Sequence, residues 1–111
     1  MERDRRSAPR VRVNLKARWV GVHSRNDATI TDISRTGCFV LSGGDVAVRE
    51  LISLEIELPY HHLIHFWAEV VDEASEIGFA VKFNSGEDED RQRLADFIES
   101  VFNSGSTKRT E

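Results

Sequence analysis

The chain has 111 residues, of which 40% are hydrophobic and 31% are charged, so it suits a single domain with a small core. No apolar run approaches the roughly 20 residues that cross a bilayer, and the charged N-terminus lacks the apolar segment of a secretory signal. The single cysteine, Cys38, cannot form a disulfide within the chain, so we expect a reduced, cytoplasmic location.

The net charge of -4 conceals an uneven distribution. Residues 1–20 hold seven basic side chains against two acidic ones, whereas residues 84–102 hold six acidic side chains against two basic ones. A short basic segment in an acidic chain suits a small or local anion better than a long polyanion.

Residues 1–10 show no periodicity and are predicted to form a flexible arm. Apolar and polar residues then alternate from Val11 to Trp19, which is typical of a strand with one face on a core. A turn is expected at 23–27, followed by short strands at 28–33 and 38–41 that the residues S-R-T-G separate.

Three further strands are predicted at 51–58, 63–71 and 77–83. Every second residue of the first and last of these is apolar and is expected to face inward: Ile52, Leu54, Ile56 and Leu58; Ile77, Phe79, Val81 and Phe83. Six short strands with turn residues between them indicate an antiparallel barrel or sandwich.

The end of the chain changes to helical spacing. Ser85 and Asp88 resemble a capping box with Asp in place of the usual Glu. Gly105 is expected to end the helix, because glycine favours the C-terminal cap. Between them, one apolar stripe recurs at helical spacing and needs a partner surface: Leu94, Phe97, Ile98, Val101 and Phe102.

Two short stretches carry the candidate site. In the arm, Arg6 and Arg10 are four residues apart and Arg5 is adjacent, and the planar fork of arginine matches phosphate oxygens or the O6/N7 edge of guanine. In D-I-S-R-T-G, residues 32–37, Asp32 can accept from the guanine N1 and N2 donors and Ser34 can donate or accept. Gly37 permits close approach of the backbone. Taken singly, a solvated arginine tail and an ordinary turn explain the same residues.

Taken together, R-x-x-x-R ("RSAPR") followed by D-x-S-x-x-G ("DISRTG") resembles the two-part signature of the PilZ domain. The stretches "VRVNLKARW" and "IGFAVKF" are also similar to the family, so the resemblance covers about residues 5–102. It implies a mainly β fold, namely a six-stranded antiparallel β-barrel with a C-terminal α-helix packed on it. We therefore expect an arm at 1–10, the barrel and helix at 11–103 and a disordered tail at 104–111.

The resemblance also implies a ligand, cyclic di-GMP, and a role for each motif residue. Arg6 and Arg10 would grip phosphate and the guanine edge as the arm wraps the ligand. Asp32 and Ser34 would contact guanine, while Gly37 would keep the surface open for the base. Arg5 would influence whether one nucleotide or a stacked pair is held.

Other chemistry finds little support in the sequence. His61, His62 and His65 lack the accompanying ligands of a zinc site, so no metal is expected. Cys38 lies on a short apolar strand and is expected to be a buried, inert thiol. Trp67 is expected either under the helix or partly exposed as a partner-docking residue. No nucleophile–base pair or carboxylate dyad has convincing spacing, so we predict no catalytic residues and no cofactor.

The sequence thus predicts a non-catalytic receptor that binds cyclic di-GMP and passes the signal to an unidentified protein partner, with an output in motility or surface attachment. Two alternatives stay open. One is a PilZ-type interaction module that does not bind the nucleotide. The other is a small barrel that binds single-stranded nucleic acid, which the acidic composition and the mostly core positions of the aromatics do not favour.

Overall fold

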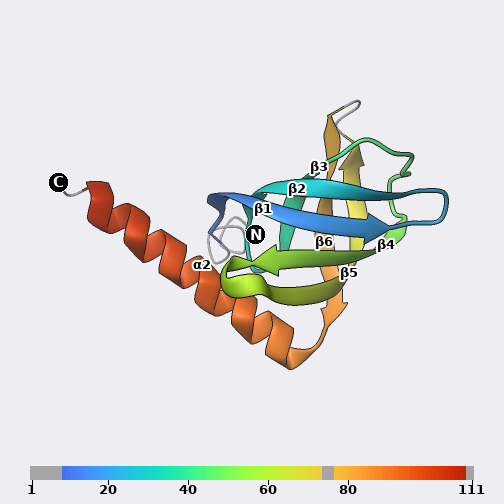
Figure 1. The fold of residues 1–111 in the computed structure, drawn as a ribbon. Coiled ribbons are helices and arrows are strands. Elements are labelled where there is room, and N and C mark those ends of the chain that lie inside the picture. Colours follow the sequence, from blue (N-terminus) through green and yellow to red (C-terminus); the bar gives the residue numbers. More distant parts are fainter. Residues whose placement is uncertain (1–8, 74–76, 110–111) are drawn as a thin grey trace, which may run out of the picture.

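A computed structural model describes residues 9–73 and 77–109 of the chain. Described in chain order (Figure 1), its elements are β1 (Val11–Val20), β2 (Arg25–Ile33), β3 (Gly37–Leu41), β4 (Leu51–Leu58), a short 3-10 helix η1 (Pro59–His61), β5 (His62–Glu73), β6 (Gly78–Gly86) and α2 (Asp88–Arg109).

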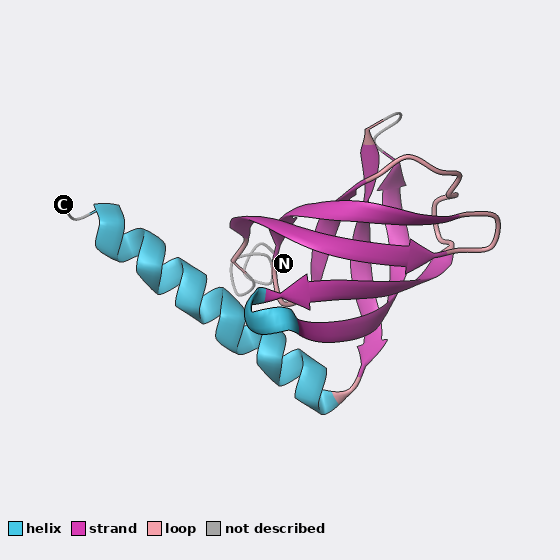
Figure 2. Ribbon diagram, viewed as in Figure 1, coloured by secondary structure: helices cyan, strands magenta, loops and turns pink. Residues whose placement is uncertain are grey.

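The six strands form a closed barrel (Figure 2), in which the antiparallel strands follow the order β1-β2-β3-β6-β5-β4. Closure comes from β1, which pairs with β4 over four residue pairs, from Ala17 opposite Ile56 to Val20 opposite Ser53. Closing the sheet removes the unpaired edges that an open sheet would expose. The predicted six-stranded barrel with a C-terminal helix is confirmed, and the sandwich alternative is not what forms.

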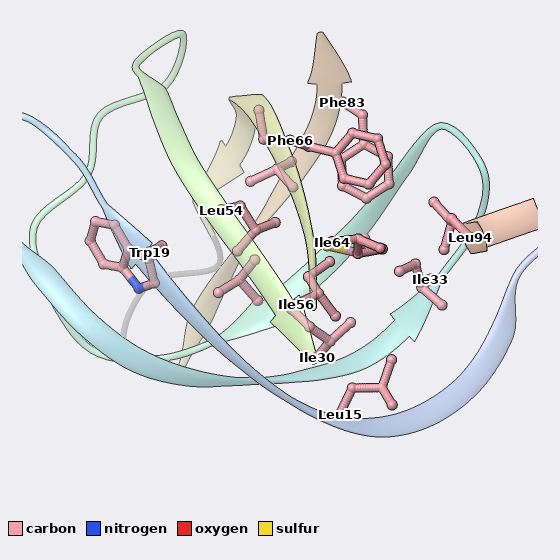
Figure 3. Packing of buried hydrophobic residues seen from close by; sticks show 14 of the residues in the cluster. Leu15, Trp19, Ile30, Ile33, Leu54, Ile56, Ile64, Phe66, Phe83 and Leu94 are labelled. Atoms are coloured by element: carbon pink, nitrogen blue, oxygen red, sulfur yellow. The ribbon is translucent and has the colours of Figure 1, made fainter. Parts of the chain in front are cut away.

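Alternation along the strands builds the core, as the sequence predicts for β1 and β4. Trp19 is fully buried, and its Nε1 donates a hydrogen bond to Ser42 Oγ at 3.0 Å, so the polar end of the indole is satisfied. The ring packs edge-on against Phe79 with centroids 5.3 Å apart. Farther along the barrel, Phe66 and Phe83 stack with centroids 4.4 Å apart (Figure 3).

Helix α2 lies across one end of the barrel (Figure 1). Leu94 and Ile98 are buried, and Leu94 points toward Ile33 and Ile64 (Figure 3). The first turn is tied to β5 because Asp90 Oδ2 accepts a hydrogen bond from the His65 amide at 3.1 Å. Three acidic side chains in this turn, Asp90 among them, also interact favourably with the positive end of the helix dipole.

Both ends of the helix differ from the sequence prediction. Ser85 belongs to β6, opposite Trp67, so it does not cap the helix. The Glu87 carbonyl accepts the first helical bond, from the Arg91 amide at 2.9 Å, which places Glu87 at the cap position. The helix continues through Gly105 to Arg109. No proline follows that glycine, and a helical glycine costs only about 1 kcal/mol relative to alanine.

Three smaller expectations are also corrected. The turn between β1 and β2 is shorter than 23–27, because β2 begins at Arg25 and the Gly21 amide closes the turn on the Ser24 carbonyl at 2.8 Å. Ile77 precedes β6 and is 61% exposed, so it does not join the inward face. Phe102 is 53% exposed, so the buried stripe of α2 stops before it.

Helix docking should therefore depend on Leu94 and not on Phe102. We expect Leu94→Ala to lower the free energy of unfolding by about 2–5 kcal/mol, because it removes a buried side chain and leaves a cavity. The matched change Phe102→Ala should cost under about 1 kcal/mol, because the ring is already largely solvated. Urea unfolding followed by tryptophan fluorescence measures both, and equal losses would contradict this placement of the helix.

Candidate ligand-binding site

Pairing of β1 with β2 brings the two sequence motifs together. Val11 lies opposite Ile33 and Arg12 opposite Asp32, so the residue before β1 reaches the end of β2. There, Nη1 of Arg10 forms an ion pair with Oδ1 of Asp32, 22 residues away in the chain. The two side chains are 54% and 34% exposed, so a ligand in solvent can reach both. The structure thus joins one arginine of the first motif to the aspartate of the second.

Ser34 lies in the turn between β2 and β3, where its side chain bonds to the backbone. Its side chain is buried, and its Oγ accepts hydrogen bonds from the amides of Thr36 at 3.1 Å and Gly37 at 3.3 Å. The Ser34 amide donates to the Gly37 carbonyl at 2.8 Å. This is a serine that shapes its own turn. In this structure its hydroxyl faces the turn backbone, so direct contact with guanine stays a prediction.

Gly37 is required by the packing of two strands. It begins β3 opposite Lys82 of β6, and a Cβ at this position would overlap the carbonyl oxygen of Val81. The carbonyl oxygen of Thr36, the residue before Gly37, accepts a hydrogen bond from the Phe83 amide at 2.8 Å, which continues the contact with β6. The absence of a side chain at Gly37 therefore allows the turn to pack closely against β6.

Arg5 and Arg6 lie outside the described residues, so their predicted roles stay predictions. Arg12 belongs to neither half of the sequence motif. It is exposed and lies directly opposite Asp32, on the solvent side of β1. The alternation of β1 places its side chain outward, but only the register of β1 on β2 reveals that it adjoins the candidate site.

Cys38 lies beneath the site and takes no part in its surface. Its side chain is fully buried. Burial raises the pKa of the thiol far above its ordinary value, the nearby Asp32 carboxylate raises it further, and the Arg10 guanidinium opposes the shift. The thiol therefore stays protonated at physiological pH, as expected of an inert core cysteine.

The remaining polar candidates make local contacts. His61 pairs with Glu57 at 2.9 Å, and Nε2 of His65 lies 2.7 Å from Ser53 Oγ. Trp67 is 45% exposed and packs edge-on against His65. Of the two positions expected for it, the partly exposed one is therefore found. Over residues 9–73 and 77–109, no three potential ligands gather as a metal site would need, and no helix has the length and apolarity to cross a membrane.

The comparisons with known proteins agree with the fold. The PilZ domain family model matches residues 4–100, so the chain belongs to the PilZ domain family. The comparison with curated proteins gives no match.

Among solved structures, the fold is similar to the Bacillus subtilis inhibitor of motility MotI/DgrA, with a TM-score of 0.74 and 23% identity over 89% of this chain and 52% of that one. It is similar to Escherichia coli YcgR in complex with c-di-GMP, with a TM-score of 0.76 and 16% identity over 96% of this chain and 50% of that one. MrkH, described as a c-di-GMP-dependent transcription regulatory factor, gives a TM-score of 0.67 and 18% identity over 86% of this chain and 50% of that one. The chain thus spans about half the length of each of these three proteins.

The structural need for Gly37 can be tested without any ligand. We expect Gly37→Ala to lower the free energy of unfolding by about 1–3 kcal/mol, because the new methyl forces β3 away from Val81. Gly43→Ala is the matched control, since a Cβ there meets nothing within 4 Å and should change stability by less than about 0.5 kcal/mol. If chemical denaturation gives the same value for both variants, the close approach of β3 and β6 is wrong.

Proposed function

We propose that this protein is a non-catalytic receptor for cyclic di-GMP. The observation that carries the proposal is the ion pair between Arg10 and Asp32, which unites the two halves of the motif on an exposed surface. Membership in the PilZ domain family and the c-di-GMP named in the descriptions of YcgR and MrkH support the choice of ligand.

The chemistry of the pair fits such a ligand. The Arg10 guanidinium can turn its fork to a phosphate or to the O6/N7 edge of guanine, and the Asp32 carboxylate can accept from the N1 and N2 donors of guanine. In the free protein each group satisfies the other. Exposed ion pairs contribute only about 0–1 kcal/mol, so exchanging this pair for ligand contacts costs little.

The arm supplies the remaining proposed contacts and the signal. We expect Arg5 and Arg6 to add phosphate contacts when the arm folds over the ligand, and Arg5 to influence whether one nucleotide or two are held. A segment that orders on binding has a different position in the free and bound states, so a protein partner can distinguish them. We propose that this protein is cytoplasmic, that it acts on a protein partner with an output in motility or surface attachment, and that it uses no metal or cofactor.

An interaction module without nucleotide binding is the second candidate. The observation in its favour is that Ser34 and Gly37 serve the β2–β3 turn and the packing on β6, so half of the motif has a structural use without a ligand. Arg10 and Asp32 have no comparable use, since their pair is exposed at the surface. For this reason the receptor is preferred.

Binding should depend on this ion pair and not on surface charge in general. We expect Arg10→Ala and Asp32→Ala each to weaken cyclic di-GMP binding at least about tenfold, because each removes a charge-assisted contact. The matched controls are Arg18→Ala and Asp27→Ala, which break another exposed ion pair, formed by Arg18 of β1 and Asp27 of β2 at 3.3 Å. Isothermal titration calorimetry measures the affinities.

Four outcomes separate the candidates. Saturable binding by the parent that only the Arg10 and Asp32 variants lose supports the receptor and its site. Binding that all four variants retain would show that the site is elsewhere. A folded parent that binds neither cyclic di-GMP nor a short oligonucleotide would instead support the interaction module, and salt-sensitive oligonucleotide binding would support the nucleic-acid alternative.

A further inference from the structure

The outer face of the barrel continues beyond the motif residues onto β3 and β6. Across the strands, Arg12 lies opposite Asp32, Asp32 opposite Phe39, and Phe39 opposite Ala80. Residues on either side of Phe39 in the chain are fully buried, so its own side chain lies on the outer face, where it is partly buried. These four residues form one row that begins at the candidate site.

A second row runs nearer the β2–β3 turn. Gly37 lies opposite Lys82, and Lys82 lies opposite Glu69 on β5. Lys82 is exposed, whereas its chain neighbours Val81 and Phe83 are buried, so the lysine stands on the same outer face as Phe39. The β3 residue opposite Lys82 is thus a glycine, which has no side chain to cover the lysine.

Some charged side chains of this surface form ion pairs and others do not. Asp32 is already paired with Arg10. Over the described ranges 9–73 and 77–109, the ion pairs that form include neither Arg12 nor Lys82, although Glu69 is the cross-strand neighbour of Lys82. Among the described residues, two cations without an ion pair thus flank the motif surface, Arg12 on β1 and Lys82 on β6.

The space between these cations suits a flat ligand. Three interstrand spacings separate β1 from β6, which is about 14 Å, and the long side chains of arginine and lysine can reach inward from both sides. Two of the residues between Arg12 and Lys82, Gly37 and Ala80, are small and protrude little from the barrel. The Phe39 ring adds apolar surface, and it lies so close to β6 that a Cβ on Gly78 would come within 3.0 Å of its Cε2 atom.

We propose that Lys82 is a further ligand-contacting residue, which binds a phosphate of the nucleotide from the β6 side while Arg12 faces it from the β1 side and Phe39 forms the apolar floor. The inference rests on the proposed function, because it extends the same site. It assigns part of the affinity to a strand that carries neither half of the sequence motif.

The test compares two exposed strand lysines by calorimetric titration with cyclic di-GMP. Lys82→Gln should weaken binding roughly three- to tenfold, and Lys82→Glu should weaken it more, because each removes an attractive charge at the ligand. Lys16→Gln on β1 is the matched control, since Lys16 is exposed but lies away from this surface, near Glu57. It should bind within about twofold of the parent, the difference expected of a distant surface substitution.

Salt dependence gives a second readout that a merely structural lysine would not affect. Raising the ionic strength screens exposed charges, so the affinity of the parent should fall with salt more steeply than that of Lys82→Gln. If the parent binds and Lys82→Gln matches it in affinity and salt dependence, this inference is overturned while the proposed receptor stands. If the folded parent does not bind at all, both fail.

Discussion

The antiparallel pairing of β1 with β2 is the constraint on which the rest of the site depends. It sets Arg12 opposite Asp32 and so brings Arg10 from the arm to the end of β2. A slip of one residue would turn every side chain of β1 to the other face, which the buried Trp19 forbids. The core therefore fixes the register, and the register fixes the distance between two motifs that lie 22 residues apart in the chain.

Hydrophobic periodicity was enough to predict the six strands and the helix, because each strand has one face on the core. Periodicity gave wrong predictions at the ends of strands, where a side chain is not constrained to one face of the sheet. Ile77 is apolar but sits at a hairpin end, and the β1–β2 pairing extends past the residues that look like a turn, to Arg25. Ser85 failed as a cap because pairing with Trp67 on β5 takes it into a strand. Barrel closure could not be predicted from local pattern, since it depends on the pairing of β1 with β4.

For the site, the two-part motif together with residue chemistry pointed to Arg10 and Asp32, because arginine and aspartate suit phosphate and guanine. The same reasoning could not separate ligand contacts from turn chemistry. Ser34 faces its own turn and Gly37 makes room for the Val81 carbonyl, and both facts come from the packing of β3 on β6. Lys82 carries no motif signal at all. Its place beside the site appears only when the strand order β3-β6 is known.

The central claim is that cyclic di-GMP binds where the two motifs meet, on the outer face at the start of β1 and the end of β2. The most direct measurement is an amide NMR titration of the labelled protein with cyclic di-GMP. The account predicts saturable shifts at residues 10–12, 32–39 and 80–83, with little change along the centre of β4 at 52–56. Saturable shifts centred on β4, or none at saturating ligand, would contradict it.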